Sequence, residues 1–109
     1  MSVSPEQIAF VKDLFADVGS VTTRKMFGGL SIYADGVIFA IVMSDGEIFL
    51  KGQGDMQTAY EDEGWPRWSY TRKDGTATSM PYWQMPEALL DDPEEACTWA
   101  RRALASLDL

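Results

Sequence analysis

The N-terminal part of the chain combines a helix-start motif with a helical pattern of apolar residues. Ser4 is positioned as an N-cap, Pro5 occupies the first helical position and Gln7 completes a capping box. An apolar stripe follows at helical spacing: Ile8, Val11, Leu14 and Phe15. Because Gly19 supplies a stop, the pattern predicts one amphipathic helix between Ser4 and Gly19.

The next thirty residues have the pattern of strands joined by tight turns. Residues 21–26 are β-branched and then basic, and residues 30–33 alternate between apolar and polar. Residues 37–43 form a continuous apolar run, which is typical of a central strand covered on both faces. Asp-Gly pairs precede this run and follow it, the second leading into residues 47–51. The pattern predicts an antiparallel meander of three or four strands.

The second half of the chain predicts a helix, a hairpin and a final helix. Asp55 is positioned to cap a short helix that runs to about Glu63. Residues 65–71 and 76–82 have strand composition, and a Lys-Asp-Gly turn joins them. Pro66 and Pro81 place both strands at an edge or an end of the sheet, where a missing N–H group is harmless.

The final helix starts at an Asp92-Pro93 cap, where the acidic first turn also favours a helix N-terminus. Its predicted core residues are Ala96, Trp99, Ala100, Ala103, Leu104 and Leu107. The resulting order is α-β-β-β-(β)-α-β-β-α, an α+β fold. At 109 residues, with no long linker and no internal repeat, residues 1–109 form a single domain.

Composition and charge restrict the possible functions. The formal charge is −8, with 17 acids against nine bases, and such a surface repels phosphate, so nucleic acid is an unlikely partner. The chain has no His, which removes the commonest general base and metal ligand. The single cysteine, Cys97, excludes an internal disulfide, and its apolar helix setting predicts an inert, half-buried thiol. We expect no enzyme activity, no cofactor and no metal.

The sequence predicts a cytoplasmic protein. Residues 1–5 have neither the basic region nor the apolar region of a signal peptide. The longest apolar run, residues 37–43, is far too short to span a membrane.

Three groups of residues remain as candidates for function. Gly28-Gly29 invites a phosphate-loop interpretation, but a strand follows these glycines where a helix would be needed, so a tight turn or bulge is favoured. A basic group either converges on an acidic partner or keeps a sheet edge soluble: Arg24, Lys25, Arg67, Arg72 and Lys73. An aromatic group forms either a stacking platform or buried packing: Trp65, Trp68, Tyr70, Tyr82 and Trp83.

Several of these segments together resemble the N-terminal domain of the TfoX/Sxy competence-regulator family. The resemblance runs from about residue 8 to residue 105. Its motifs are residues 24–29 (RKMFGG), 32–40, 48–51, 79–86 (SMPYWQMP) and 89–95, followed by Trp99-Ala100. Two departures are the Trp-Pro-Arg-Trp segment at residues 65–68 and the end of the sequence at Leu109, where the full-length regulators have a second domain.

The resemblance implies a curved antiparallel sheet packed against helices, of the secretion-chaperone-like type, and frequent homodimers. It also implies a link to the transcriptional regulation of bacterial competence, with no catalytic residues. We therefore expect a protein-interaction domain whose partner belongs to the transcription machinery or is a regulator. Direct DNA binding through a local basic edge and small-molecule binding in an aromatic pocket are the alternatives.

The predicted partner surface centres on the motif that follows the first predicted strand. Its residues are Arg24, Lys25, Met26, Phe27 and Gly28, with Arg67 and Tyr82 nearby. We assign charge to Arg24 and Lys25, an apolar anchor to Phe27 and close backbone approach to Gly28.

Overall fold

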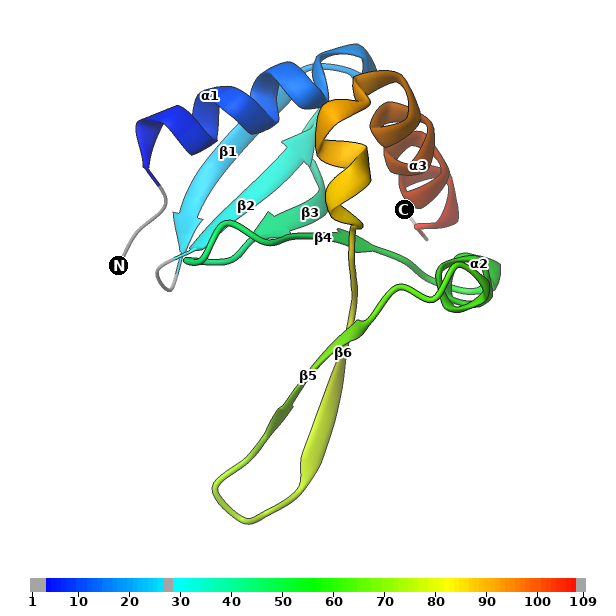
Figure 1. The fold of residues 1–109 in the computed structure, drawn as a ribbon. Helices are drawn as coiled ribbons and strands as arrows, with labels where there is room; N and C mark the ends of the chain where they lie inside the picture. Colours follow the sequence, from blue (N-terminus) through cyan, green and yellow to red (C-terminus); the bar gives the residue numbers. More distant parts are fainter. Residues whose placement is uncertain (1–3, 27–28, 108–109) are drawn as a thin grey trace.

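The computed structural model describes residues 4–26 and 29–107, with Met26 and Tyr70 described by their backbones alone. The elements are α1 (Pro5–Leu14), η1 (Ala16–Val18), β1 (Val21–Met26), β2 (Gly29–Ala34), β3 (Val37–Val42), β4 (Ile48–Lys51), α2 (Asp55–Asp62), β5 (Arg67–Thr71), β6 (Ala77–Gln84), η2 (Glu87–Asp91) and α3 (Pro93–Ser106) (Figure 1). The six strands of the described residues form one antiparallel sheet, ordered β1-β2-β3-β4-β6-β5. The predicted α+β class and order of elements are confirmed.

The first and last helices begin at the caps that the sequence predicts. The Ser4 hydroxyl accepts a hydrogen bond from the Gln7 backbone N–H, and the Gln7 side chain accepts one from the Ser4 N–H. The Asp92 carboxylate likewise accepts from the Glu95 N–H at the start of α3. These reciprocal or charged caps satisfy N–H groups that lack partners within a helix.

The predicted cap of α2 is wrong. Gly54 occupies the N-cap position and Asp55 is the first residue of the helix, with no side-chain capping hydrogen bond. Gly54 has a φ of 57°, a left-handed conformation that glycine adopts without strain. Asp55 therefore contributes only its negative charge beside the N-terminus of the helix.

Strand β3 contains a bulge that decides which of its side chains enter the core. Its register with β2 shifts from Ile32–Ala40 to Tyr33–Ile38, which leaves Phe39 as an extra residue. Phe39 and Ala40 consequently both lie in the main core, where the Phe39 ring meets Phe15 edge to face at 5.2 Å between centroids. Ile38 instead packs on the other side of the sheet.

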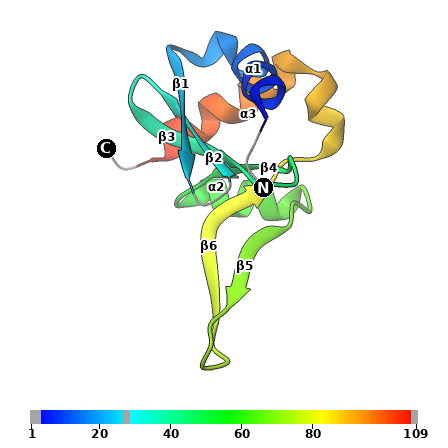
Figure 2. The same ribbon diagram turned by 90° about the vertical axis from the view of Figure 1, so that its left-hand side faces the viewer.

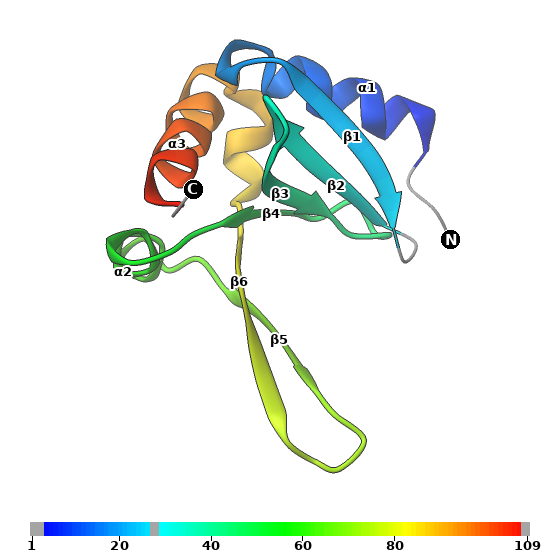
Figure 3. The ribbon, with the colours of Figure 1, turned by 180° about the vertical axis from the view of Figure 1, so that it is seen from behind.

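Helices α1 and α3 cover one face of the sheet and enclose the main core (Figures 1 and 3). An aromatic group fills the end of this core near α2: Tyr60, Trp65, Trp83 and Trp99. The Tyr60 hydroxyl donates to the Lys51 carbonyl oxygen at 3.0 Å. Trp65 thus belongs to the core, and the strand predicted over residues 65–71 begins only at Arg67.

The β5–β6 hairpin extends away from the rest of the molecule, on the side opposite to α1 and α3 (Figures 1 and 2). β5 is an edge strand, as Pro66 immediately before it predicts, but an edge position is wrong for β6, which lies between β4 and β5 in the strand order. Pro81 is tolerated inside the sheet because it lies where the β5–β6 register is irregular, between the pairs Arg67–Trp83 and Ser69–Ser79.

Candidate partner-binding site

A second apolar cluster lies on the sheet face opposite to the helices, which we call the open face. Its residues are Ile38, Ile41, Met43, Phe49, Trp68, Met80 and Tyr82, and we call them the corner cluster. They come from β3, β4, β5 and β6 and from the residue after β3; among the described residues, no helical side chain belongs to the cluster. The cluster therefore fills the corner between the body of the sheet and the projecting hairpin.

The hairpin partly covers this corner with aromatic side chains. The Trp68 ring centroid lies 6.4 Å from that of Phe49 and 6.2 Å from that of Tyr82. Burial raises the pKa of the Tyr82 hydroxyl, and the nearby Tyr33 raises it further. Tyr33 on β2 is paired with Ile38 of the corner cluster, so it lies on the open face together with Tyr82 of β6.

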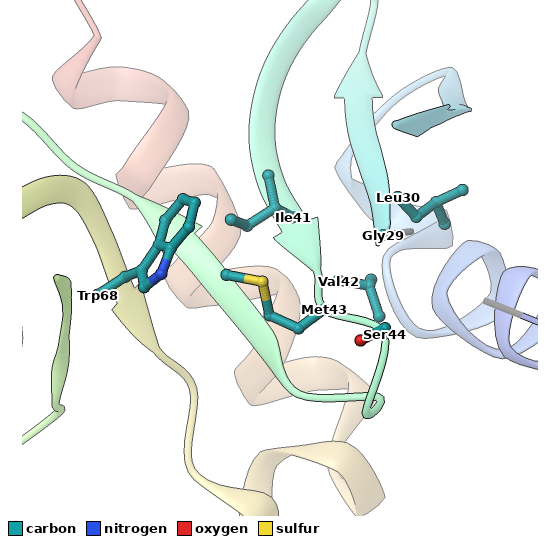
Figure 4. A pocket seen from close by; sticks show the side chains of 7 residues that line it. All are labelled: Gly29, Leu30, Ile41, Val42, Met43, Ser44 and Trp68. Atoms are coloured by element: carbon teal, nitrogen blue, oxygen red, sulfur yellow. The ribbon is translucent and has the colours of Figure 1, made fainter. Parts of the chain in front are cut away.

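A small apolar cavity lies beside the corner cluster, between Trp68 on one side and Gly29 and Leu30 on the other (Figure 4). The remaining lining residues are Ile41, Val42, Met43 and Ser44, and the cavity volume is about 170 Å³. An apolar cavity of about 150 Å³ is large enough for benzene, whereas drug-sized ligands occupy roughly 300–1,000 Å³. We call this space the corner cavity; its size suits one large apolar side chain.

Strand register places the two predicted cations of β1 on opposite faces. Arg24 is paired with Ser31, and Ser31 with Ile41 of the corner cluster, so Arg24 lies on the open face. Lys25 is paired with Leu30, which belongs to the main core, so Lys25 lies at the margin of the helix-covered face. Adjacent strand residues point to opposite faces, which separates two cations that are neighbours in sequence.

The other predicted site residues are divided in the same way. Tyr82 belongs to the corner cluster and is 8% exposed. Arg67 lies against the helix-side face: its guanidinium carbon is 4.6 Å from the Trp83 ring centroid, and its Nε donates to the Met80 carbonyl oxygen at 2.9 Å. Phe27 and Gly28 lie outside the described residues, and Met26 is described only through its backbone pairing with Gly29. The structure therefore brings Arg24 and Tyr82 to one face, and Lys25 and Arg67 to the other.

The predicted basic and aromatic groups do not converge. Arg24 and Lys25 are on the edge strand β1, whereas Arg67, Arg72 and Lys73 are on the hairpin at the other end of the strand order. Trp65 and Trp83 lie in the main core, whereas Trp68 and Tyr82 lie in the corner cluster. Trp65 packs tightly in that core, with its ring centroid 4.9 Å from Tyr60 and 4.7 Å from Trp99.

Sequence reasoning missed most of the corner. Ile41, Met43 and Phe49 were assigned only to strands, and Lys51 received no role although its pairing with Tyr82 places it on the open face. One signal was present: the continuous apolar run of residues 37–43 predicts cover on both faces, and Ile41 and Val42 are only 4% and 2% exposed. The sequence did not show that the hairpin supplies the second cover.

The single thiol of the chain is buried, and the described residues form no cluster of metal ligands. Cys97 is 2% exposed, more buried than predicted, and its thiol donates to the Leu14 carbonyl oxygen at 3.2 Å. The described residues hold no cluster of three or more His, Cys, Asp or Glu side chains that could bind a metal ion. Among the described helices, none has the length and apolar character needed to cross a membrane.

Comparison with known proteins identifies the family. The model of the TfoX N-terminal domain matches residues 13–107. The DNA transformation protein TfoX1 of Aliivibrio fischeri is 27% identical over 95 residues, covering 87% of this chain and 43% of that protein. Protein Sxy of Escherichia coli is 30% identical over 88 residues, covering 81% of this chain and 41% of its own length. The chain thus spans about two-fifths of these curated relatives, and it belongs to the TfoX N-terminal domain family.

Proposed function

We propose that this chain is a non-enzymatic regulatory module, acting in the cytoplasm in a pathway related to DNA transformation, that binds a protein partner at the corner cluster. The family and the name of the Aliivibrio fischeri relative support the pathway. The corner supports the mechanism, because it combines an apolar floor with a cavity of side-chain size. Binding energy at protein interfaces concentrates at such pockets, where one large side chain is fully desolvated.

The corner cavity is the observation that carries the proposal. Met43 and Trp68 line it and are each only partly buried, so a partner could still remove apolar surface from water. Methionine side chains adapt their shape to a bound surface, which suits Met43 and Met80 to a binding site. Phe27 and Gly28 immediately precede Gly29, which lines the cavity, and we retain them as proposed members of the site together with Met26.

The proposal is tested by capture of partners from the native cytoplasm with a Met43→Gln variant. This substitution keeps the length of the side chain but places an amide in the cavity, so we expect the loss of the transcription regulator or polymerase component that the wild-type chain retains. Phe10→Gln is the matched control, because Phe10 is 43% exposed on α1, away from the open face.

Both variants are checked by circular dichroism and thermal unfolding before capture. Loss of a partner with Met43→Gln but not with Phe10→Gln supports the corner as the binding site. Equal capture by the wild-type chain and by Met43→Gln contradicts the proposal.

A further inference from the structure

We infer that the corner takes an acidic protein segment that carries one large apolar side chain, which enters the corner cavity. This inference rests on the proposed function and names the chemistry of the partner. It follows from the distribution of charge over the fold, from the size of the cavity and from the position of the cations around it.

Acidic and basic residues are distributed unequally between the sheet and the rest of the chain. The six described strands contain four of the nine bases and no Asp or Glu, although the chain has 17 acids. The bases in the strands are Arg24, Lys25, Lys51 and Arg67. The acids among the described residues lie on helices, turns and loops, so the sheet is locally cationic in a molecule of charge −8.

The cations of the open face lie on both sides of the apolar floor. Arg24, Ser31, Ile41 and Phe49 follow one another across β1, β2, β3 and β4 as directly paired residues. Lys51 lies two residues beyond Phe49 on β4 and is paired with Tyr82. A segment crossing this floor would therefore meet a cation at the β1 side and another at the hairpin side.

The tip of the hairpin adds two more cations. Arg72 and Lys73 are exposed there. The neighbouring Asp74 carboxylate accepts a hydrogen bond from the Thr76 N–H at 2.9 Å, and this bond lowers the pKa of Asp74. Asp74 thus holds the turn, and Arg72 and Lys73 are the two cations beside this one acid at the tip.

Other occupants fit these observations less well. A second copy docked by the same face would bring Arg24 and Lys51 against the Arg24 and Lys51 of its partner, and like charges at an interface are unfavourable. A nucleic acid needs a dense row of phosphate contacts, whereas the described strands offer only Arg24 and Lys51 on this face. A free small molecule of ordinary size exceeds the cavity of about 170 Å³.

The test uses a short fluorescent peptide with one central Phe flanked by Asp and Glu, titrated with the full chain in fluorescence anisotropy. Two companion peptides replace the Phe by Ala or the acids by Lys. We expect binding of the first peptide, about tenfold weaker binding of the Ala peptide and no binding of the Lys peptide. Equal binding of the acidic and basic peptides, or no binding of any, overturns the inference.

The fold supplies a matched pair of variants for the same titration. Arg24→Glu and Lys25→Glu make the same charge change one residue apart, on opposite faces of β1. We expect Arg24→Glu to weaken binding of the acidic peptide at least about tenfold and Lys25→Glu to change it less than about twofold. Equal loss in both variants means that only net charge matters, and it overturns the inference.

Competing probes separate the other occupants. The inference is overturned when a short duplex DNA displaces the acidic peptide with equal affinity. It is also overturned when sedimentation shows a dimer and the dimer no longer binds the peptide. The proposed function fails separately: it fails when Met43→Gln leaves capture of the native partner unchanged. A third result is also informative: the native partner is lost with Met43→Gln but captured equally by the wild-type chain and by Arg24→Glu. This result supports the corner as the binding site and overturns the inference that its partner segment is acidic.

Discussion

At the scale of the residue, the adjacent cations Arg24 and Lys25 lie on opposite faces of the sheet. Arg24 shares the open face with the corner cluster, whereas its neighbour Lys25 is paired with a residue of the main core. The sequence presents the two residues as one basic motif. Alternation along a strand explains why only one of them is available at the corner.

Tyr60 gives a prediction on the pH dependence of stability. Burial raises the pKa of its hydroxyl above the ordinary value of 10.0, and Arg102 opposes this shift without reversing it. Below pH 10 the phenol is neutral in both the folded and the unfolded chain, so it adds no pH dependence. Above pH 10 the unfolded chain loses the proton first, and the free energy of unfolding falls by up to about 1.4 kcal/mol per pH unit for this group.

The Tyr60→Phe variant isolates this effect. It removes the hydrogen bond to the Lys51 carbonyl oxygen and should cost about 1 kcal/mol at neutral pH. Urea titrations between pH 8 and pH 11 should then show a shallower loss of stability for Tyr60→Phe than for the wild-type chain. Parallel curves for the two proteins would exclude Tyr60 as the source.

At the scale of the element, the bulge in β3 distributes side chains between the core and the corner. Strict alternation from Val42 would place Ile38 with the core and Phe39 on the open face. The extra residue reverses this, so Phe39 is completely buried and Ile38 packs at the margin of the corner cluster. A bulge of this kind has no clear signal in a continuous apolar run.

Substitutions at the bulge test this assignment. Phe39→Ala removes a buried ring from its contact with Phe15 and should cost about 3–5 kcal/mol, whereas Ile38→Ala should cost about 1–2 kcal/mol because its side chain is only partly buried. Chemical denaturation of both variants gives the comparison. An Ile38→Ala variant that is less stable than Phe39→Ala would refute the register.

The helices and strands could be predicted from local sequence patterns, whereas the binding corner depends on contacts between distant segments and could not. Ser4 and Asp92 were predicted as caps because a capping side chain bonds to a backbone group within the same turn. The cap of α2 was misplaced because a left-handed Gly54 cannot be distinguished by sequence from an ordinary loop glycine. The corner was missed because it depends on the direction of the hairpin, which brings Trp68 over residues of β3 and β4.

At the scale of the whole molecule, the described strands carry four bases and no acid, whereas the described acids lie on helices, turns and loops. The acids repel one another in the folded state, and the cationic sheet offsets only part of this repulsion. The net charge of −8 therefore describes the overall field but not the face that we propose for binding.

Salt should affect stability and binding in opposite directions. Raising sodium chloride from about 10 mM to about 0.5 M screens the repulsion among the acids and should raise the melting temperature by about 2–5 °C. The same change should weaken binding of the acidic peptide, because it screens attraction between unlike charges. Scanning calorimetry measures the melting temperature and fluorescence anisotropy measures peptide binding across the same salt series. A melting temperature that falls with salt would show that repulsion among the acids does not limit stability.

The position of Cys97 also allows slow opening of the core to be measured by chemical labelling of its thiol. It is the only thiol in the chain, and it is 2% exposed. From α3 it donates a hydrogen bond to the backbone carbonyl oxygen of Leu14, the last residue of α1. A thiol reagent can reach it only after those two helices separate. The labelling rate in native buffer therefore measures how often the core opens, and comparison with the global unfolding rate tells whether α1 detaches before the sheet does.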